Sequence, residues 1–338
     1  MLGLKSESSL KTILNRFYRG YNFKERLKHD PIEFPHRYST PEDIEIAGFI
    51  ASCFAYGKVE LFKPVIEKIL IPGSRRPANF FKNFTLKKDS KYFKGISYRF
   101  NEEKDILCLI YMLSKTLKKW GSLKNLFYQY YKPEHEDIRA ALSGFVEYFL
   151  NMDTSPIYGK MGRLKPPLPL GKGDFSRPSS EQSYGSVQFF PMPEKGSACK
   201  RINLFLRWMV RTKDIDFGIW DKVPPSKLII PLDTHIAKIS RCLDLTKRIS
   251  SDWKTAKEIT ESLKKLDPRD PLKYDFALCH HGISGLCKGK KSITACQNCV
   301  RPYGLLIPPP NPPIPPLLKS PHCPPLTKGG EGGLFLGA

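Results

Sequence analysis

Acidic residues are scarce in this chain of 338 residues. It contains 33 Asp and Glu residues against 55 Lys and Arg residues, which leaves a net charge of +22 near neutral pH. Such an excess disfavours a basic partner, because like charges repel, and it favours a polyanion. Nucleic acid is the first candidate, since the basic residues are interleaved with aromatic ones along the chain.

Long hydrophobic runs are missing as well. No apolar run reaches the roughly 20 residues that a membrane-spanning helix needs. The first ten residues, MLGLKSESSL, lack the apolar core of a signal peptide. We therefore expect a cytoplasmic protein with no membrane partner. In that compartment the nine cysteines are not expected to form a disulfide framework.

The alternating apolar pattern of β-strands is also absent, whereas helical spacing is frequent. Thr40 and Pro41 mark the start of a helix that is apolar nearly all round, and Gly57 separates it from an antiparallel partner. Four further segments with helical spacing lie at about 8–20, 104–120, 122–131 and 134–151. The pattern predicts an all-α protein.

Composition divides the chain into five parts. Residues 153–190 and 302–338 are rich in Pro and Gly, and they share similar phrases, PPLPLGKGDF and PPLTKGGEGGLF. We interpret them as a low-complexity insertion and a disordered tail, both derived from a repetitive DNA element read in frame. The other parts are a helical subdomain with a basic and aromatic region at 1–152, a second helical subdomain at 191–283, and a Cys-containing loop at 284–301.

The stretch 195–236 combines a basic helix with a capping aspartate. Its first half predicts a helix that is apolar except for one face, and this face carries Lys200, Asn203, Arg207 and Arg211. Its second half, PLDTHI, places Asp233 directly before the next apolar helical spacing, where a carboxylate caps a helix. An amine and a carboxylate at one site can act as nucleophile and as acid–base group.

The turn before this helix contains Lys195, Gly196 and Ser197. A glycine-containing turn that leads into a helix offers backbone N–H groups to a phosphate. The reactive amine could belong to Lys195 or to Lys200. We favour Lys200, because it lies on the basic face of the helix.

The residues KRINLFLRWM followed by PLDTHIAKISRCLDL resemble the lysine-to-aspartate stretch of the helix-hairpin-helix DNA glycosylases. The archaeal 8-oxoguanine glycosylases are the most similar members. A longer stretch, from about residue 17 to 283, is similar to an uncharacterised bacterial family that looks like a remote branch of this superfamily. One departure is the hairpin, where PEKGS stands in place of the usual LPGVG.

The resemblance implies a helix-hairpin-helix glycosylase-like fold, with the site between two helical subdomains. It implies a monomeric enzyme of base-excision repair that acts on double-stranded DNA, a glycosylase with AP lyase activity on a damaged base such as an oxidised purine. Lys200 would attack the sugar and form a Schiff base, and Asp233 would stabilise the charge on the sugar. The remaining assignments are Arg207 and Arg211 as phosphate contacts and Asn203 and Trp208 as the border of the base pocket.

The helix pair around Gly57 resembles a hairpin of the same enzymes, in which a side chain at the turn reaches the DNA. By position this side chain is Tyr56 or Lys58, although the usual glutamine is missing. Residues 73–103 mix basic and aromatic residues. This mixture fits a surface that contacts nucleic acid, and it fits equally well short helices that bury their aromatic rings.

Three cysteines near the end, Cys287, Cys296 and Cys299, have the spacing C-x8-C-x2-C. This resembles the iron–sulfur loop of several of these glycosylases, in which the spacing is C-x6-C-x2-C-x5-C. Cys279 or His281 could supply the fourth ligand of a cluster or of a zinc ion. The glycosylase chemistry itself requires no cofactor.

Two other functions fit the same residues. A DNA- or RNA-binding protein could have kept the scaffold without the chemistry, and it would form no covalent adduct with DNA. A nucleotide- or tRNA-processing enzyme would act on RNA and not on damaged duplex DNA. Taken alone, Lys200 also fits a lysine at the edge of the core, and Asp233 fits a simple helix cap.

Overall fold

The computed structural model describes residues 3–159 and 185–284. Within these ranges it contains α-helices and short 3-10 turns but no β-strand, so the all-α prediction is confirmed for them. The only extended pairings there are two isolated bridges, between Tyr98 and Asn101 and between Ser197 and Asp252. No described helix is long and apolar enough to cross a membrane.

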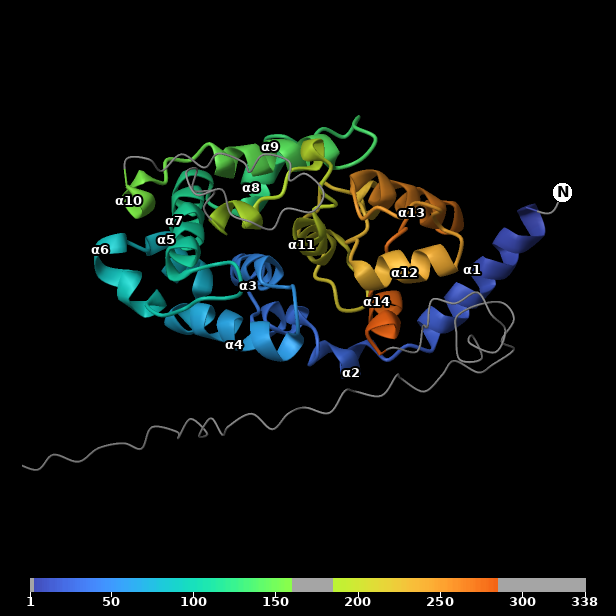
Figure 1. Ribbon diagram of the computed structural model, residues 1–338, viewed down its shortest axis with the longest axis horizontal. Helices are drawn as coiled ribbons and strands as arrows, with labels where there is room; N and C mark the ends of the chain where they lie inside the picture. Colours follow the sequence, from blue (N-terminus) through green and yellow to red (C-terminus); the bar gives the residue numbers. More distant parts are fainter. Residues whose placement is uncertain (1–2, 160–184, 285–338) are drawn as a thin grey trace, which may run out of the picture.

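Nine of the described helices have nine or more residues: α1 Gly3–Arg19, α3 Pro41–Cys53, α4 Val59–Leu70, α7 Glu103–Trp120, α9 Arg139–Leu150, α11 Lys200–Val210, α12 Thr234–Cys242, α13 Trp253–Leu266 and α14 Asp275–Ile283. The shorter ones are α2 Phe23–Leu27, α5 Pro77–Asn83, α6 Leu86–Asp89, α8 Leu123–Tyr128 and α10 Ser155–Tyr158. In Figure 1, α11 lies between a group that contains α3 to α10 and a second group that contains α12, α13 and α14.

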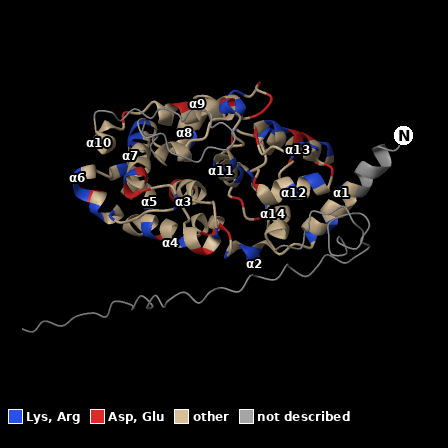
Figure 2. Ribbon diagram, in the orientation of Figure 1, with Lys and Arg blue, Asp and Glu red and all other residues tan. Residues whose placement is uncertain are grey.

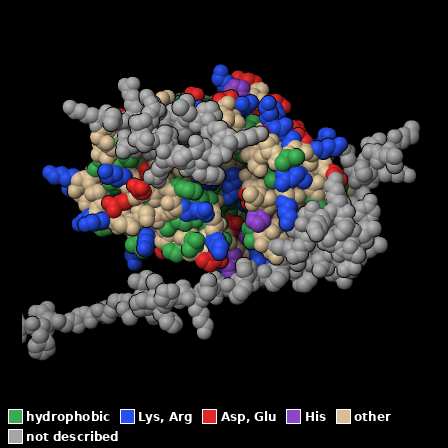
Figure 3. Space-filling view, in the orientation of Figure 1, with side chains coloured by type: hydrophobic (Ala, Val, Ile, Leu, Met, Phe, Trp, Pro, Cys, Tyr) green, Lys and Arg blue, Asp and Glu red, His purple; other side chains and the backbone are tan. Residues whose placement is uncertain are grey.

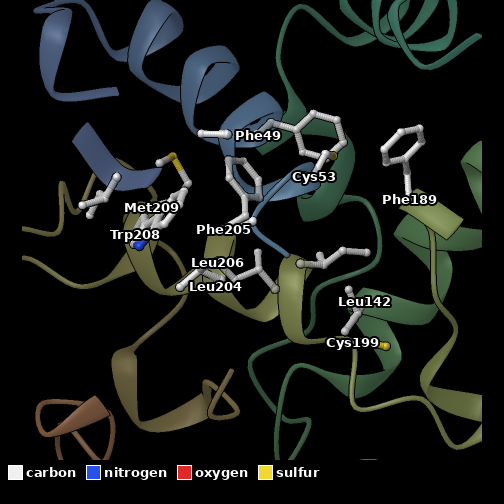
Figure 4. Packing of buried hydrophobic residues seen from close by; sticks show 14 of the residues in the cluster. Phe49, Cys53, Leu142, Phe189, Cys199, Leu204, Phe205, Leu206, Trp208 and Met209 are labelled. Atoms are coloured by element: carbon white, nitrogen blue, oxygen red, sulfur yellow. The ribbon is translucent and has the colours of Figure 1, made fainter. Parts of the chain in front are cut away.

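The helix α3 forms the centre of the first group. It begins as expected, with the Thr40 side chain accepting a hydrogen bond from the backbone N–H of Asp43 and with Pro41 at its first position. All its residues from Asp43 to Cys53 are buried. Phe49 packs edge-on against Phe205 of α11, with 5.4 Å between the ring centroids (Figure 4). Burial of such rings fixes α11 against α3, because each contributes about 1.5–3 kcal/mol.

The first helix packs against the last described one. Tyr274, just before α14, donates a hydrogen bond of 2.7 Å from its hydroxyl to Asn15 of α1. The ring of Phe17 meets the ring of His281 edge-on, with 5.5 Å between centroids. Elements from opposite ends of the sequence therefore lie side by side (Figure 1).

The described ends of the Pro- and Gly-rich segment 153–190 belong to the core. Phe189 and Phe190 are buried. The ring of Phe190 stacks on that of Phe149 in α9, with 4.4 Å between centroids. The interpretation of residues 153–190 as a low-complexity insertion is therefore wrong at both described ends, because residues 155–158 form α10 and apolar residues within 185–190 pack against α9.

Basic residues are distributed over nearly all the helices (Figure 2). On the face that Figure 3 shows, they are spread over both groups and do not gather in one patch. In the basic and aromatic region, Phe81, Phe84 and Phe93 are buried, while Tyr92 is exposed. Most of these aromatic rings therefore pack inward. This fits short helices that bury their aromatic rings better than a surface that contacts nucleic acid.

Candidate active site

The first two residues of α11 attach this helix to the end of α3. The amine of Lys200 donates a hydrogen bond of 2.9 Å to the carbonyl oxygen of Ala55. The guanidinium of Arg201 donates one of 2.9 Å to the carbonyl oxygen of Cys53. Because the carbonyls at the end of a helix carry partial negative charge, they favour such cations. The predicted nucleophile is thus held in a defined place.

The turn before α11 leads directly into the helix. The helix begins at Lys200, and its N-cap is Cys199 in a left-handed conformation with φ 48°. Gly196 also has a positive φ of 83°, which favours glycine, and its carbonyl accepts a hydrogen bond of 3.0 Å from the N–H of Trp253. Lys195 and Gly196 are exposed, and their role as phosphate contacts stays a prediction.

Asp233 caps α12 as the sequence predicted. One oxygen of its carboxylate accepts a hydrogen bond of 2.8 Å from the backbone N–H of Ile236. The other oxygen accepts one of 3.4 Å from the thiol of Cys279 on α14. The carboxylate is therefore engaged by two different helices.

Lys200 and Asp233 both act on the thiol of Cys279. Burial raises the pKa of this thiol well above its usual value, and the negative charges of Asp233 and Asp275 raise it further. The positive charge of Lys200 lowers it. Two side chains 33 positions apart in the sequence thus act on one thiol, Asp233 through a hydrogen bond and Lys200 through its charge.

The assignment of Arg207 and Arg211 as phosphate contacts is wrong, because both side chains are only 2% exposed and are paired with carboxylates. Arg207 is 3.2 Å from Asp216 and also pairs with Asp275, while Arg211 is 2.9 Å from Asp270. The sequence pattern correctly put the two arginines on one face of α11. It could not show that aspartates distant in the sequence cover this face.

The assignment of Asn203 and Trp208 to the border of a base pocket is also wrong. Asn203 is 1% exposed, and its side-chain amide donates to the carbonyl of Ala198 at 3.0 Å. Trp208 is 0% exposed and lies in the hydrophobic core beside Met209 (Figure 4). The helix α11 is buried on all sides except near its start, so neither residue can border an open site.

Tyr56 lies in the turn between α3 and α4 but points back into the protein. Its hydroxyl donates a hydrogen bond of 2.7 Å to the side chain of Asn101. Arg201 lies over its ring, with 5.0 Å from the guanidinium carbon to the centroid, and Arg99 lies at 6.0 Å. Burial raises the pKa of Tyr56 to about 12. Lys58 is exposed at the other end of the turn.

Arg99 and Phe100 were not singled out from the sequence, yet they form the most exposed part of this region. They lie at the tip of a turn closed by two backbone hydrogen bonds of 2.8 and 2.9 Å between Tyr98 and Asn101. Arg99 has a left-handed conformation with φ 53°, and Phe100 is 57% exposed. The adjacent Gly57 has a positive φ of 83°, a backbone conformation that favours glycine. In the sequence, only the mixture of basic and aromatic residues at 73–103 pointed to Arg99 and Phe100.

Tyr56, Lys58, Arg99, Phe100 and Arg201 are called the Tyr56 patch below. Within residues 3–159 and 185–284, neither Arg99 nor Arg201 forms an ion pair with a carboxylate. The patch therefore carries uncompensated positive charge close to Lys200, which is joined to Ala55, one residue before Tyr56. Such a surface suits an anionic partner.

The predicted metal site falls mostly outside the described residues, because Cys287, Cys296 and Cys299 lie there. Cys279 donates to Asp233, and the ring of His281 is fully buried. Among the residues that the structure describes, no group of three or more His, Cys, Asp or Glu side chains could hold a metal ion. An iron–sulfur cluster or a zinc ion stays a prediction.

Comparisons with known proteins give one match. A family model described as "Protein of unknown function (DUF2400)" matches residues 30–284, which is more than half of the chain. Searches among curated proteins and among solved structures found no match. The matched range includes α3, α11, α12 and α14 and thus every element of the candidate site. The chain therefore belongs to the DUF2400 family.

Proposed function

We propose that this protein is a DNA glycosylase with AP lyase activity that removes a damaged base, with an oxidised purine as the first candidate. The observation that carries the proposal is that the Cys279 thiol is hydrogen-bonded to Asp233 and lies within the electrostatic influence of Lys200. The resemblance of this lysine-to-aspartate stretch to the helix-hairpin-helix glycosylases supports the same pair. A nucleophilic amine close to a carboxylate is the arrangement that this reaction requires.

The chemistry assigns one step to each side chain. The free amine of Lys200 attacks the sugar carbon C1′, the bond from C1′ to the base breaks, and the base leaves with a proton. The ring bond from C1′ to O4′ then breaks, the proton on the nitrogen passes to O4′, and a Schiff base between Lys200 and C1′ remains. Asp233 stabilises the positive charge that develops on the sugar as the base departs. This last effect requires Asp233 to be ionised.

The Tyr56 patch is the part of the surface that we assign to DNA. Its exposed arginine, Arg99, suits the phosphate backbone, and an exposed ring such as Phe100 suits stacking on a base that has lost its neighbour. The net charge of +22 supports a polyanionic partner. The patch takes over the role that the sequence had given to Arg207 and Arg211, which are buried.

A non-catalytic DNA- or RNA-binding protein is the second candidate. The observation in its favour is the hydrogen bond from Lys200 to Ala55, because a lysine that only caps α3 needs no catalytic role. The two candidates differ in one property. The enzyme releases a base, and the binding protein does not.

Base release from duplexes that contain 8-oxoguanine, uracil or an abasic site tests the proposal. We expect wild type to act on at least one of them, and Asp233→Asn to lower the single-turnover rate by about 100-fold or more. Asparagine is a good helix cap, so α12 should be retained. The control is Asp252→Asn, which alters the cap of α13 instead. No base release by wild type would contradict the proposal, and full activity of Asp233→Asn would remove Asp233 from it.

A further inference from the structure

Cys279 is the only side chain from another helix that the described structure joins to Asp233 by a hydrogen bond. The contact depends on a close approach of α14 to α12. Gly282, one turn after Cys279, makes this approach possible, because a Cβ there would lie 2.7 Å from the Cβ of His235 and 3.2 Å from Ile239. The position of the thiol relative to the carboxylate is thus fixed by packing.

The charges around the thiol keep it protonated. Asp233 lies at the start of α12, Asp275 lies on α14 and is paired with Arg207, and Lys200 lies at the start of α11. Asp30, hydrogen-bonded to His280 at 3.0 Å, also faces Cys279, as does Tyr21. Burial and the aspartates raise the pKa of the thiol, so it remains a hydrogen-bond donor at neutral pH.

We propose that Cys279 is a positioning residue for Asp233, whose thiol fixes the orientation of the carboxylate. The inference rests on the catalytic role proposed for Asp233. The N–H of Ile236 holds one carboxylate oxygen and the thiol holds the other, so the carboxylate cannot rotate freely.

The test compares wild type, Cys279→Ala and Cys279→Ser in single-turnover base release at saturating DNA, with the DNA affinity of each protein measured in parallel. Cys279→Ala should be about five- to tenfold slower with unchanged DNA affinity, the effect of losing one hydrogen bond. Cys279→Ser should restore the rate, since serine is also a donor.

The control is Cys242→Ala, which removes a buried thiol at the far end of α12 and should leave the rate unchanged. A wild-type rate in Cys279→Ala, or a serine variant as slow as the alanine one, would overturn the inference while the proposed function stands. Loss of bound iron or zinc from both Cys279 variants would also overturn it, in favour of a metal ligand. No base release by wild type would refute the proposed function and the inference together.

Discussion

Buried ionisable groups give the most direct predictions for single residues, and Glu45 of α3 is the clearest. Its carboxylate is 3% exposed and accepts hydrogen bonds from the N–H groups of Leu123 and Lys124, at 2.8 and 2.9 Å, and from the indole of Trp220 at 2.9 Å. It thereby joins α3 to the start of α8. Burial nevertheless raises its pKa to about 7.

This pKa predicts how stability depends on pH. Between its ordinary pKa of 4.5 and about 7, the folded protein holds a proton on Glu45 that the unfolded chain does not. Stability should therefore fall as pH rises through this window, by about 3 kcal/mol at most. When the free energy of unfolding is measured by urea denaturation at several pH values, Glu45→Gln should not show this fall with rising pH. Glu42→Gln, at an exposed position of the same helix, should keep it, and an equal slope in all three proteins would contradict the prediction.

Elements differ in how far the sequence determines them. The starts of α3, α12 and α13 were predictable, because Thr40, Asp233 and Asp252 cap them through contacts within three residues. The surroundings of α11 were not predictable. Asp270 and Asp275 come from a segment about 60 residues later, and a helical pattern carries no information on such contacts.

The paired arginines of α11 should contribute to stability and not to DNA binding. Arg211→Met would leave the carboxylates of Asp214, Asp216 and Asp270 without their shared cation. We expect a loss of about 3–5 kcal/mol in the free energy of unfolding, measured by urea denaturation. Arg37→Met, which removes a surface arginine paired with Glu33 and Glu67, should cost at most about 1 kcal/mol. Equally small losses of stability in Arg211→Met and Arg37→Met would contradict the structural role of Arg211.

The turn that carries Phe100 should contribute to DNA binding and not to stability. Phe100→Ala should leave the free energy of unfolding nearly unchanged, because the ring is 57% exposed. It should weaken duplex binding by about 1–3 kcal/mol, the value of one base–aromatic stack. Leu61→Ala, on α4, removes an apolar side chain of equal exposure and should not change DNA affinity. DNA affinity is measured by a fluorescence anisotropy titration. If Phe100→Ala and wild type bind DNA equally well, the Tyr56 patch is not part of the DNA interface.

At the scale of the whole molecule, the candidate site joins distant parts of the chain. Lys200 at the start of α11 is hydrogen-bonded to Ala55, and its charge also acts on Cys279, the partner of Asp233; α11 lies between the two groups of helices (Figure 1). The resemblance to the glycosylases identifies Lys200 and Asp233 from their sequence motif alone. It does not identify Cys279 as a partner of Asp233, because only the packing of α14 on α12 places its thiol beside the carboxylate.

The net charge of the chain predicts a strong salt dependence. If the protein binds duplex DNA mainly through its basic residues, the logarithm of the binding constant should fall linearly with the logarithm of the salt concentration. Affinity at 50 and 200 mM salt should differ by about 10³-fold or more if six or more phosphates are contacted. A binding constant that does not change with salt would contradict the electrostatic account of the partner.

Borohydride trapping on a duplex with an abasic site tests the central claim most directly, because it captures a Schiff base as a covalent adduct. Lys200→Gln is the informative variant, since glutamine can still donate to the Ala55 carbonyl and so preserve the junction with α3. Lys195→Gln is the matched control for the exposed lysine before α11. We predict an adduct with wild type and with Lys195→Gln and none with Lys200→Gln. An adduct that persists in Lys200→Gln, or no adduct with wild type while salt-sensitive binding is intact, would contradict the account.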